Sequence, residues 1–125
     1  RICLHPTLED PHHDMIIAQR VDNCVAPHKH ANKSDTYHVM PGSARFVFFS
    51  ESGDILLTGV LDQQHPILRV PANQYHSTIP LSPWFVFHES ARGPFNAAGM
   101  TKAPWLRTKE ELLAALDRHV AAPQR

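Results

Sequence analysis

The stretch Pro27-His28-Lys29-His30-Ala31-Asn32-Lys33-Ser34-Asp35 decides how this chain is interpreted. In a β-strand, residues i and i+2 point to the same face, with Cα atoms about 6.6 Å apart. Imidazoles at His28 and His30 can therefore converge on one metal ion at about 2.1 Å, while Lys29 points the other way into solvent. Two histidines at this spacing are by themselves a weak signal, because such pairs are often only polar surface.

Asp35 strengthens the signal, although it lies five residues after His30. That odd separation would place it on the opposite face of an unbroken strand. The intervening Ala-Asn-Lys-Ser segment is typical of a turn, and a turn or bulge can reset the facing of the residues that follow it. We therefore expect Asp35, Tyr37 and Val39 to point inward on a strand that ends at Pro41-Gly42.

Two patterns in the chain resemble the two cupin motifs. The first is His28-x-His30-x4-Asp35-x6-Gly42, with Asp where Glu is usual, and the second is Pro71-x-Asn73-x2-His76, with Asn where Gly is usual. After Gly, Asn is the residue that best tolerates the left-handed conformation. The resemblance implies a jelly roll with the two motifs on neighbouring strands. The implied metal ligands, all pointing into the barrel, are His28, His30, Asp35 and His76.

The rest of the chain favours the same all-β class. Eleven prolines divide it into short pieces, which disfavours a helical bundle. Between them lie strand-length runs rich in β-branched and aromatic residues: Met15–Val21, Arg45–Ser50, Ile55–Val60, Ile67–Val70 and Trp84–Glu89. Ser50–Asp54 predicts a hairpin turn in which Gly53 can take a positive φ. We expect a double-stranded β-helix, the cupin jelly roll, over residues 1–107.

The C-terminus predicts one amphipathic helix over residues 108–122. Thr108 and Glu111 have the spacing of a capping box. Leu112, Leu113, Leu116 and Val120 then follow at helical spacing. We expect this helix to pack on the same domain, with packing against a partner as the alternative.

Composition limits the classes of partner. A length of 125 residues suits one domain, and twelve basic residues balance twelve acidic ones. That balance argues against binding nucleic acid or an anionic membrane. The longest apolar run is far shorter than the ~20 residues that span a bilayer, and no leader is apparent, so the cytoplasm is expected. Cys3 and Cys24 predict two free, mostly buried thiols rather than a disulfide.

Within the cupins, the chain resembles the WbuC family of cupin-fold metalloproteins over roughly residues 1–107. The features that carry the resemblance are Arg1-x-Cys3-x-His5, Gln19-Arg20, Pro27-His28-Lys29-His30, Glu89 with Gly93-Pro94-Phe95, and Trp105. Two positions depart from the family pattern, since Cys3 replaces an expected Asn and Asp35 is one methylene shorter than Glu. The resemblance implies that His5, Gln19 and Arg20 line a ligand pocket, and it implies a homodimer.

The ligand set is compatible with several divalent ions. Three imidazoles and a carboxylate suit zinc, iron(II), nickel, copper or manganese. Four protein ligands would close a tetrahedral structural zinc site. In an octahedral site the same four leave two positions for water or substrate. The shorter Asp35 side chain leaves open whether it reaches the ion directly or through water.

Tyr37 and Glu89 are the candidate catalytic residues. Tyr37 shares the inward face with Asp35, and its alternative role is that of a half-buried core tyrosine. The face of the last strand that carries Phe85, Phe87 and Glu89 is expected to be buried. A buried carboxylate needs a partner or a raised pKa, and Arg20 or Arg1 is the expected partner. The remaining histidines considered are expected to face solvent: His12, His13, His65 and His119.

The sequence therefore predicts a metal-binding cupin that binds or transforms a small polar molecule. The WbuC resemblance adds a sugar or sugar nucleotide in surface-polysaccharide (O-antigen) biosynthesis, and hence a metal-dependent isomerase as one possible enzyme. Two alternatives stay open at this point: a mononuclear iron(II) dioxygenase, and a non-catalytic metal-dependent binding module.

Overall fold

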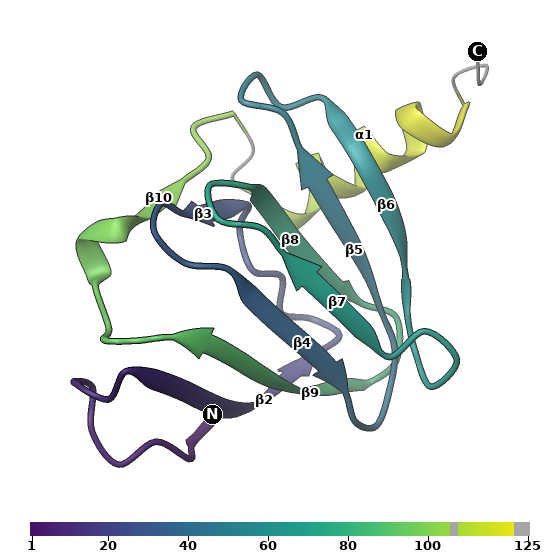
Figure 1. The fold of residues 1–125 in the computed structure, drawn as a ribbon. Coiled ribbons are helices and arrows are strands. Elements are labelled where there is room, and N and C mark those ends of the chain that lie inside the picture. Colours follow the sequence, from purple (N-terminus) through teal and green to yellow (C-terminus); the bar gives the residue numbers. More distant parts are fainter. Residues whose placement is uncertain (106–107, 122–125) are drawn as a thin grey trace.

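The computed structural model describes residues 1–105 and 108–121. In this part of the chain two five-stranded antiparallel sheets face each other, one in the order β1-β2-β9-β4-β7 and the other in the order β10-β3-β8-β5-β6 (Figure 1). The strands are β1 (Ile2–Cys3), β2 (His12–Arg20), β3 (His28–His30), β4 (Asp35–Val39), β5 (Ala44–Phe49), β6 (Ile55–Leu61), β7 (Ile67–Val70), β8 (Tyr75–Pro80), β9 (Trp84–Arg92) and β10 (Met100–Lys102). A 3₁₀ turn, η1 (Ala97–Gly99), precedes β10, and helix α1 (Lys109–Ala121) follows it. The predicted all-β class with one C-terminal helix is confirmed.

All five runs predicted as strands from composition are strands, and the first motif predicted β3 and β4; composition did not predict β1, β8 or β10. The most informative omission is β8, in which all six residues are buried. Its inner face lies against the opposite sheet and its outer face is covered by α1, so the strand shows no alternation of polar and apolar residues. A strand buried on both faces cannot be recognised by a period of two.

Every second side chain of β4 and of β9 points into the core between the two sheets. Asp35, Tyr37 and Val39 are buried along β4, as the reset in facing predicted. On β9 the buried face carries Phe85 and Phe87, also as predicted. The core cluster between the sheets contains Tyr37, Val39, Ala44, Phe48, Leu61, Val70, Phe85 and Phe87. These apolar residues fill one end of the space between the sheets, and the buried polar residues lie at the other end.

Helix α1 lies on the outer face of the second sheet. The capping box forms as expected: the Thr108 hydroxyl accepts from the Glu111 amide at 3.1 Å, and the Glu111 carboxylate accepts from the Thr108 amide at 3.1 Å. Leu112 and Leu116 are buried, whereas Val120 is 76% exposed. The cluster under the helix contains Val47, Phe49, Tyr75, Ile79, Ala103, Leu112 and Leu116. The predicted domain boundary at 107 and the helix end at 122 lie outside the described residues.

Two turns take the conformations that their residue types predict. Gly42, after β4, has φ of +92°, and a Cβ atom there would lie 2.1 Å from the Trp84 carbonyl oxygen. Asn73, before β8, has φ of 62°, which is the left-handed conformation expected of it. Its amide donates to the His30 carbonyl at 2.7 Å, so this turn ties the second motif to the first. Within the described ranges, no helix is long and apolar enough to cross a membrane.

Candidate metal centre

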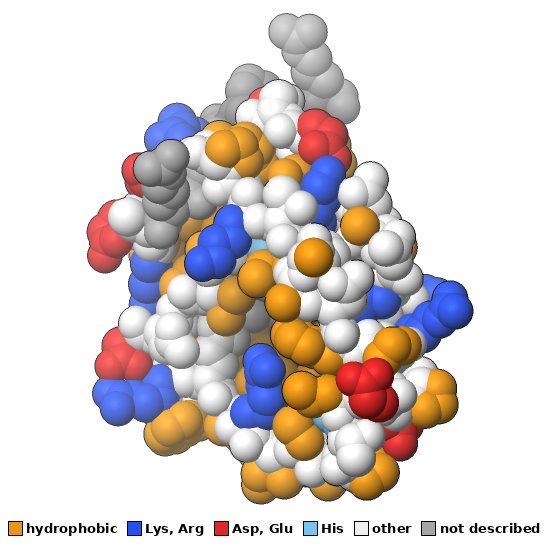
Figure 2. Space-filling model, turned by 90° about the vertical axis from the view of Figure 1, so that its left-hand side faces the viewer, with side chains coloured by type: hydrophobic (Ala, Val, Ile, Leu, Met, Phe, Trp, Pro, Cys, Tyr) orange, Lys and Arg blue, Asp and Glu red, His pale blue; other side chains and the backbone are white. Residues whose placement is uncertain are grey.

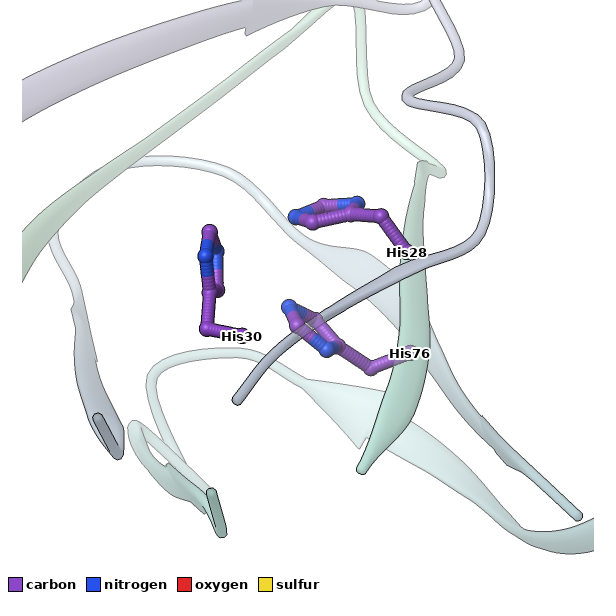
Figure 3. Close-up of side chains that lie close together, drawn as sticks. All are labelled: His28, His30 and His76. Atoms are coloured by element: carbon purple, nitrogen blue, oxygen red, sulfur yellow. The ribbon is translucent and has the colours of Figure 1, made fainter. Parts of the chain in front are cut away.

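Three histidines converge between the two sheets. His28 and His30 lie two residues apart on β3, and the pairing of β3 with β8 sets His28 directly opposite His76. Their ligand atoms all lie within 4.8 Å of one another (Figure 3). Two nitrogens bound to one ion at about 2.1 Å lie at most about 4.2 Å apart, so small side-chain rotations bring all three into coordination range.

Backbone carbonyls orient two of these imidazoles. The Nδ1 atom of His28 lies 3.0 Å from the Ala26 carbonyl oxygen, and that of His76 lies 2.9 Å from the Gln74 carbonyl oxygen. Because only a protonated nitrogen can donate to a carbonyl, Nδ1 carries the hydrogen in both rings and the lone pair is on Nε2. The same two-residue offset holds both rings in the tautomer that binds a metal through Nε2.

Burial keeps the three imidazoles neutral. It is the largest cause that lowers the pKa of His30 and of His76, each to about 4, and it also lowers the pKa of His28. The Lys33 ammonium further lowers the pKa of His30, while the Asp35 carboxylate acts in the opposite direction. Neutral imidazoles at neutral pH have free lone pairs, so a metal ion does not have to displace protons from them.

Asp35 lies beside the histidines and does not complete their group. Its Oδ2 atom is 3.7 Å from His30 Nε2, and its Oδ1 atom is 3.1 Å from the Lys33 ammonium. The side chain is 1% exposed, yet Oδ1 accepts no hydrogen bond of acceptable geometry among the described residues. A buried carboxylate oxygen without a hydrogen bond is costly, and a water bound to a metal ion would satisfy it. These residues therefore fit a divalent ion that three imidazoles bind directly and that the Asp35 carboxylate contacts through a water molecule.

Tyr37 and Glu89 face the same cavity side by side. They are direct partners across β4 and β9, so their side chains share the inward face. The Tyr37 hydroxyl lies 3.3 Å from His76 Nε2, the atom whose lone pair a metal would use. Burial, followed by the charges of Glu89 and Asp35, raises the pKa of Tyr37 well above its ordinary value, so its hydroxyl stays protonated.

Glu89 has a raised pKa, and Lys33 rather than Arg20 is its ion-pair partner. Burial and then the Asp35 carboxylate raise its pKa to about 7, against the opposing charges of Lys33 and Arg1. The Lys33 ammonium lies 4.0 Å from the Glu89 carboxylate. Arg20 instead pairs with Asp22 at 2.6 Å, so the expected Arg20 partnership is wrong. Lys33 stands inside the first motif, two residues before Asp35, and the sequence interpretation overlooked it as a partner.

The three residues that the resemblance placed in the pocket have different positions. His5 and Gln19 line the cavity. Gln19 is 3% exposed, and its amide is bound to Thr78 by two hydrogen bonds of 3.0 and 3.2 Å, so it braces β2 against β8. Arg20 is exposed and lies outside the cavity lining, which corrects the expectation. Successive residues of a strand point to opposite faces, so Gln19 and Arg20 cannot both point inward.

Three further expectations about single residues are wrong. His13 is buried, 6% exposed, and stacks on His5 with ring centroids 3.9 Å apart. Lys29 is not solvated, because its ammonium pairs with Glu51 at 2.6 Å and lies 4.5 Å from the Tyr75 ring centre. Cys3 and Cys24 are free, as predicted, but Cys3 is exposed rather than buried.

The histidines open into one large cavity. Its volume is about 1050 Å³, which is large enough for a ligand bigger than a monosaccharide. His28, His30 and His76 line it together with Tyr37 and Glu89. Figure 2 shows a hollow on this side of the molecule, with apolar side chains on its walls.

Comparisons with known proteins identify the fold. A family model described as a domain of unknown function, DUF6016, matches residues 1–61. The comparison with curated proteins finds no match. An uncharacterized conserved protein with a double-stranded β-helix domain from Klebsiella pneumoniae is 20% identical with a TM-score of 0.63, covering 81% of this chain and 75% of its own.

Two further similar structures are those of a capsular polysaccharide assembling protein and a sugar isomerase. CapF, a capsular polysaccharide assembling protein from Staphylococcus aureus, is 13% identical with a TM-score of 0.66 and covers 75% of this chain. A dTDP sugar isomerase from Desulfovibrio desulfuricans is 14% identical with a TM-score of 0.64 and covers 73% of this chain. This chain spans only 29% of the CapF chain and 63% of the isomerase chain. These likenesses show the fold: the chain is a cupin-type double-stranded β-helix.

Proposed function

We propose that this chain is a metal-dependent cupin, similar to the WbuC family, that binds or transforms a sugar or sugar nucleotide of surface-polysaccharide biosynthesis. The observation that carries the proposal is the group of three neutral imidazoles, with ligand atoms within 4.8 Å of one another, in the lining of a large cavity. The fold shared with a capsular polysaccharide assembling protein and a dTDP sugar isomerase supports the choice of a sugar-related ligand. A homodimer, expected from the resemblance, stays a prediction.

The proposed roles follow from the geometry around the histidines. His28, His30 and His76 would hold one divalent ion, and Asp35 would bind a water next to it. When bound, such an ion supplies a Lewis acid for an oxygen atom of the ligand.

Tyr37 and Glu89 would handle hydrogen bonds and protons. The hydroxyl of Tyr37 stays protonated and donates a hydrogen bond to the ligand. Glu89 has a pKa of about 7, so at neutral pH it can both accept and release a proton.

Elemental analysis of purified variants tests the metal site. We expect His76→Ala to lower the bound metal at least about tenfold, because the substitution removes one of three ligands. His65→Ala is the control, since its side chain is 75% exposed and lies outside the cavity lining. Full metal occupancy in His76→Ala would overturn the site and with it the proposed function.

A second experiment tests the reaction. The metal-loaded protein is incubated in deuterated water with a panel of dTDP- and UDP-sugars and followed by NMR. An isomerase that moves a proton next to a carbonyl incorporates deuterium into its substrate, and Glu89→Gln should abolish the incorporation. Oxygen uptake by protein loaded with iron(II) would indicate a dioxygenase instead. Binding of the sugars without turnover would indicate a binding module.

A further inference from the structure

The mouth of the cavity brings together basic side chains from the edges of both sheets. Strand β10 is an edge strand, and its pairing with β3 sets Lys102 directly opposite His28. Direct partners in an antiparallel pair share a face, so Lys102 points inward, and it lines the cavity. At the edge of the other sheet, Arg1 also lines the cavity, and its charge acts on Glu89.

Two basic side chains in the cavity lining, Lys102 and Arg1, are not neutralised, in contrast to a third, Lys33. Lys33 is paired with Asp35 and lies 4.0 Å from Glu89. Neither Lys102 nor Arg1 forms an ion pair with any residue of the described ranges. Figure 2 shows basic side chains beside the hollow. The mouth therefore carries positive charge before any metal ion adds to it.

An apolar wall lies beside this charge. Leu8 and Phe95 line the cavity although they are 58% and 60% exposed, and Met100 lines it from β10. The Phe95 amide donates to the Leu8 carbonyl at 2.9 Å, which ties the two segments of the wall together. Exposed apolar side chains at the edge of a cavity favour a ligand that covers them.

From this juxtaposition, and resting on the function proposed above, we propose that the ligand is an organic anion. Its carboxylate or phosphate group binds the basic side chains of the mouth, Lys102 above all, and its apolar or planar part packs against Phe95. Unpaired cations in a concave, partly apolar site attract and hold an oxyanion far better than they do at a flat surface. A free neutral sugar is therefore not the preferred ligand.

Titration calorimetry on the zinc-loaded protein at low salt tests this inference with matched probes. Thymidine 5′-diphosphate is compared with thymidine, and benzoate with benzamide, so that phosphate and carboxylate are tested separately. We expect at least one anion to bind about tenfold more tightly than its neutral partner, and to bind more weakly as salt is added. Equal affinities within both pairs, or no binding of either anion, would overturn the inference.

Two variants separate the mouth from the metal. Lys102→Gln should weaken binding of the preferred anion about fivefold. Arg118→Gln removes the same charge from α1, outside the cavity lining, and should change nothing. An equal effect of the two substitutions would overturn the role of Lys102.

Zinc is measured in every sample, so the proposed function is judged separately. Wild-type protein that prefers anions but holds no zinc would overturn the metal-dependent function and support the anion preference. Full zinc occupancy without any anion preference would overturn the inference alone.

Discussion

The buried carboxylate of Glu89 makes the pH dependence of stability predictable. Its pKa is raised from 4.5 to about 7 in the folded chain, chiefly by burial. Between these values the folded state binds a proton that the unfolded state has released. Glu89 therefore lowers the free energy of unfolding as the pH rises from 4.5 to 7, which is the reverse of the usual behaviour of a carboxylate.

Glu89→Gln removes this dependence while keeping the shape of the side chain. A pKa difference of about 2.5, at 1.36 kcal/mol for each unit, corresponds to about 3 kcal/mol. The Lys33 ammonium, 4.0 Å away, keeps its closer partner Asp35 at 3.1 Å, so the variant loses little attraction. We expect the variant to be about 3 kcal/mol more stable than the wild type at pH 8 and close to it at pH 4.5.

Urea unfolding of both proteins between pH 4.5 and 8, with a chelator present, gives the free energy of unfolding at each pH. The chelator is needed because a nearby metal ion would itself lower the pKa of Glu89. The histidines with lowered pKa values also lower the free energy of unfolding as the pH falls. Both proteins contain these histidines, so their contribution cancels in the difference between the two free energies of unfolding. A difference that stays constant with pH, or grows as the pH falls, would refute the assignment of a raised pKa to Glu89.

Two further substitutions test the carboxylate and the helix. Asp35→Asn should weaken metal binding about tenfold in competition with a chelator and still be purified with bound metal, because the carboxylate is proposed to bind through water; loss of the bound metal to the level of His76→Ala would make Asp35 a direct ligand. Leu112→Ala should lower the free energy of unfolding by about 2–5 kcal/mol, because Leu112 is 0% exposed between α1 and the sheet. The control Leu113→Ala, at a side chain that is 40% exposed, should cost less than about 1 kcal/mol. Equal costs in urea unfolding would contradict the packing of α1.

Features that depend on residues close in sequence were predictable. The inward facing of His28 and His30 follows from the period of a strand, and the capping box at Thr108 follows from a spacing of three. The positive φ of Asn73 follows from its own side chain. Each of these depends on a few bonds of the backbone, whose geometry varies little from protein to protein.

The expectation for Arg20 failed for a reason that is itself local. The resemblance placed Gln19 and Arg20 together in the pocket, but neighbouring residues of a strand face opposite ways. Gln19 is turned inward by its hydrogen bonds to Thr78, and Arg20 consequently faces solvent beside Asp22. The alternation of side chains along a strand excludes that Gln19 and Arg20 both point into the pocket. Only the contact of Gln19 with β8 decides that Gln19 points inward and Arg20 does not.

The metal motif in residues 27–35, together with His76 from the second motif, shows what the sequence determines and what the tertiary structure determines. The sequence by itself determined the strand-turn-strand character of residues 27–35 and the residue types available for a metal. The resemblance to the cupin motifs already implied neighbouring strands for His28 and His76. The tertiary structure alone decided that these two residues lie directly opposite each other, that Lys33 takes Asp35 as its partner, and that Lys102 joins them from β10. Pairing between distant strands is set by how the whole chain buries its apolar surface, and no local period contains that information.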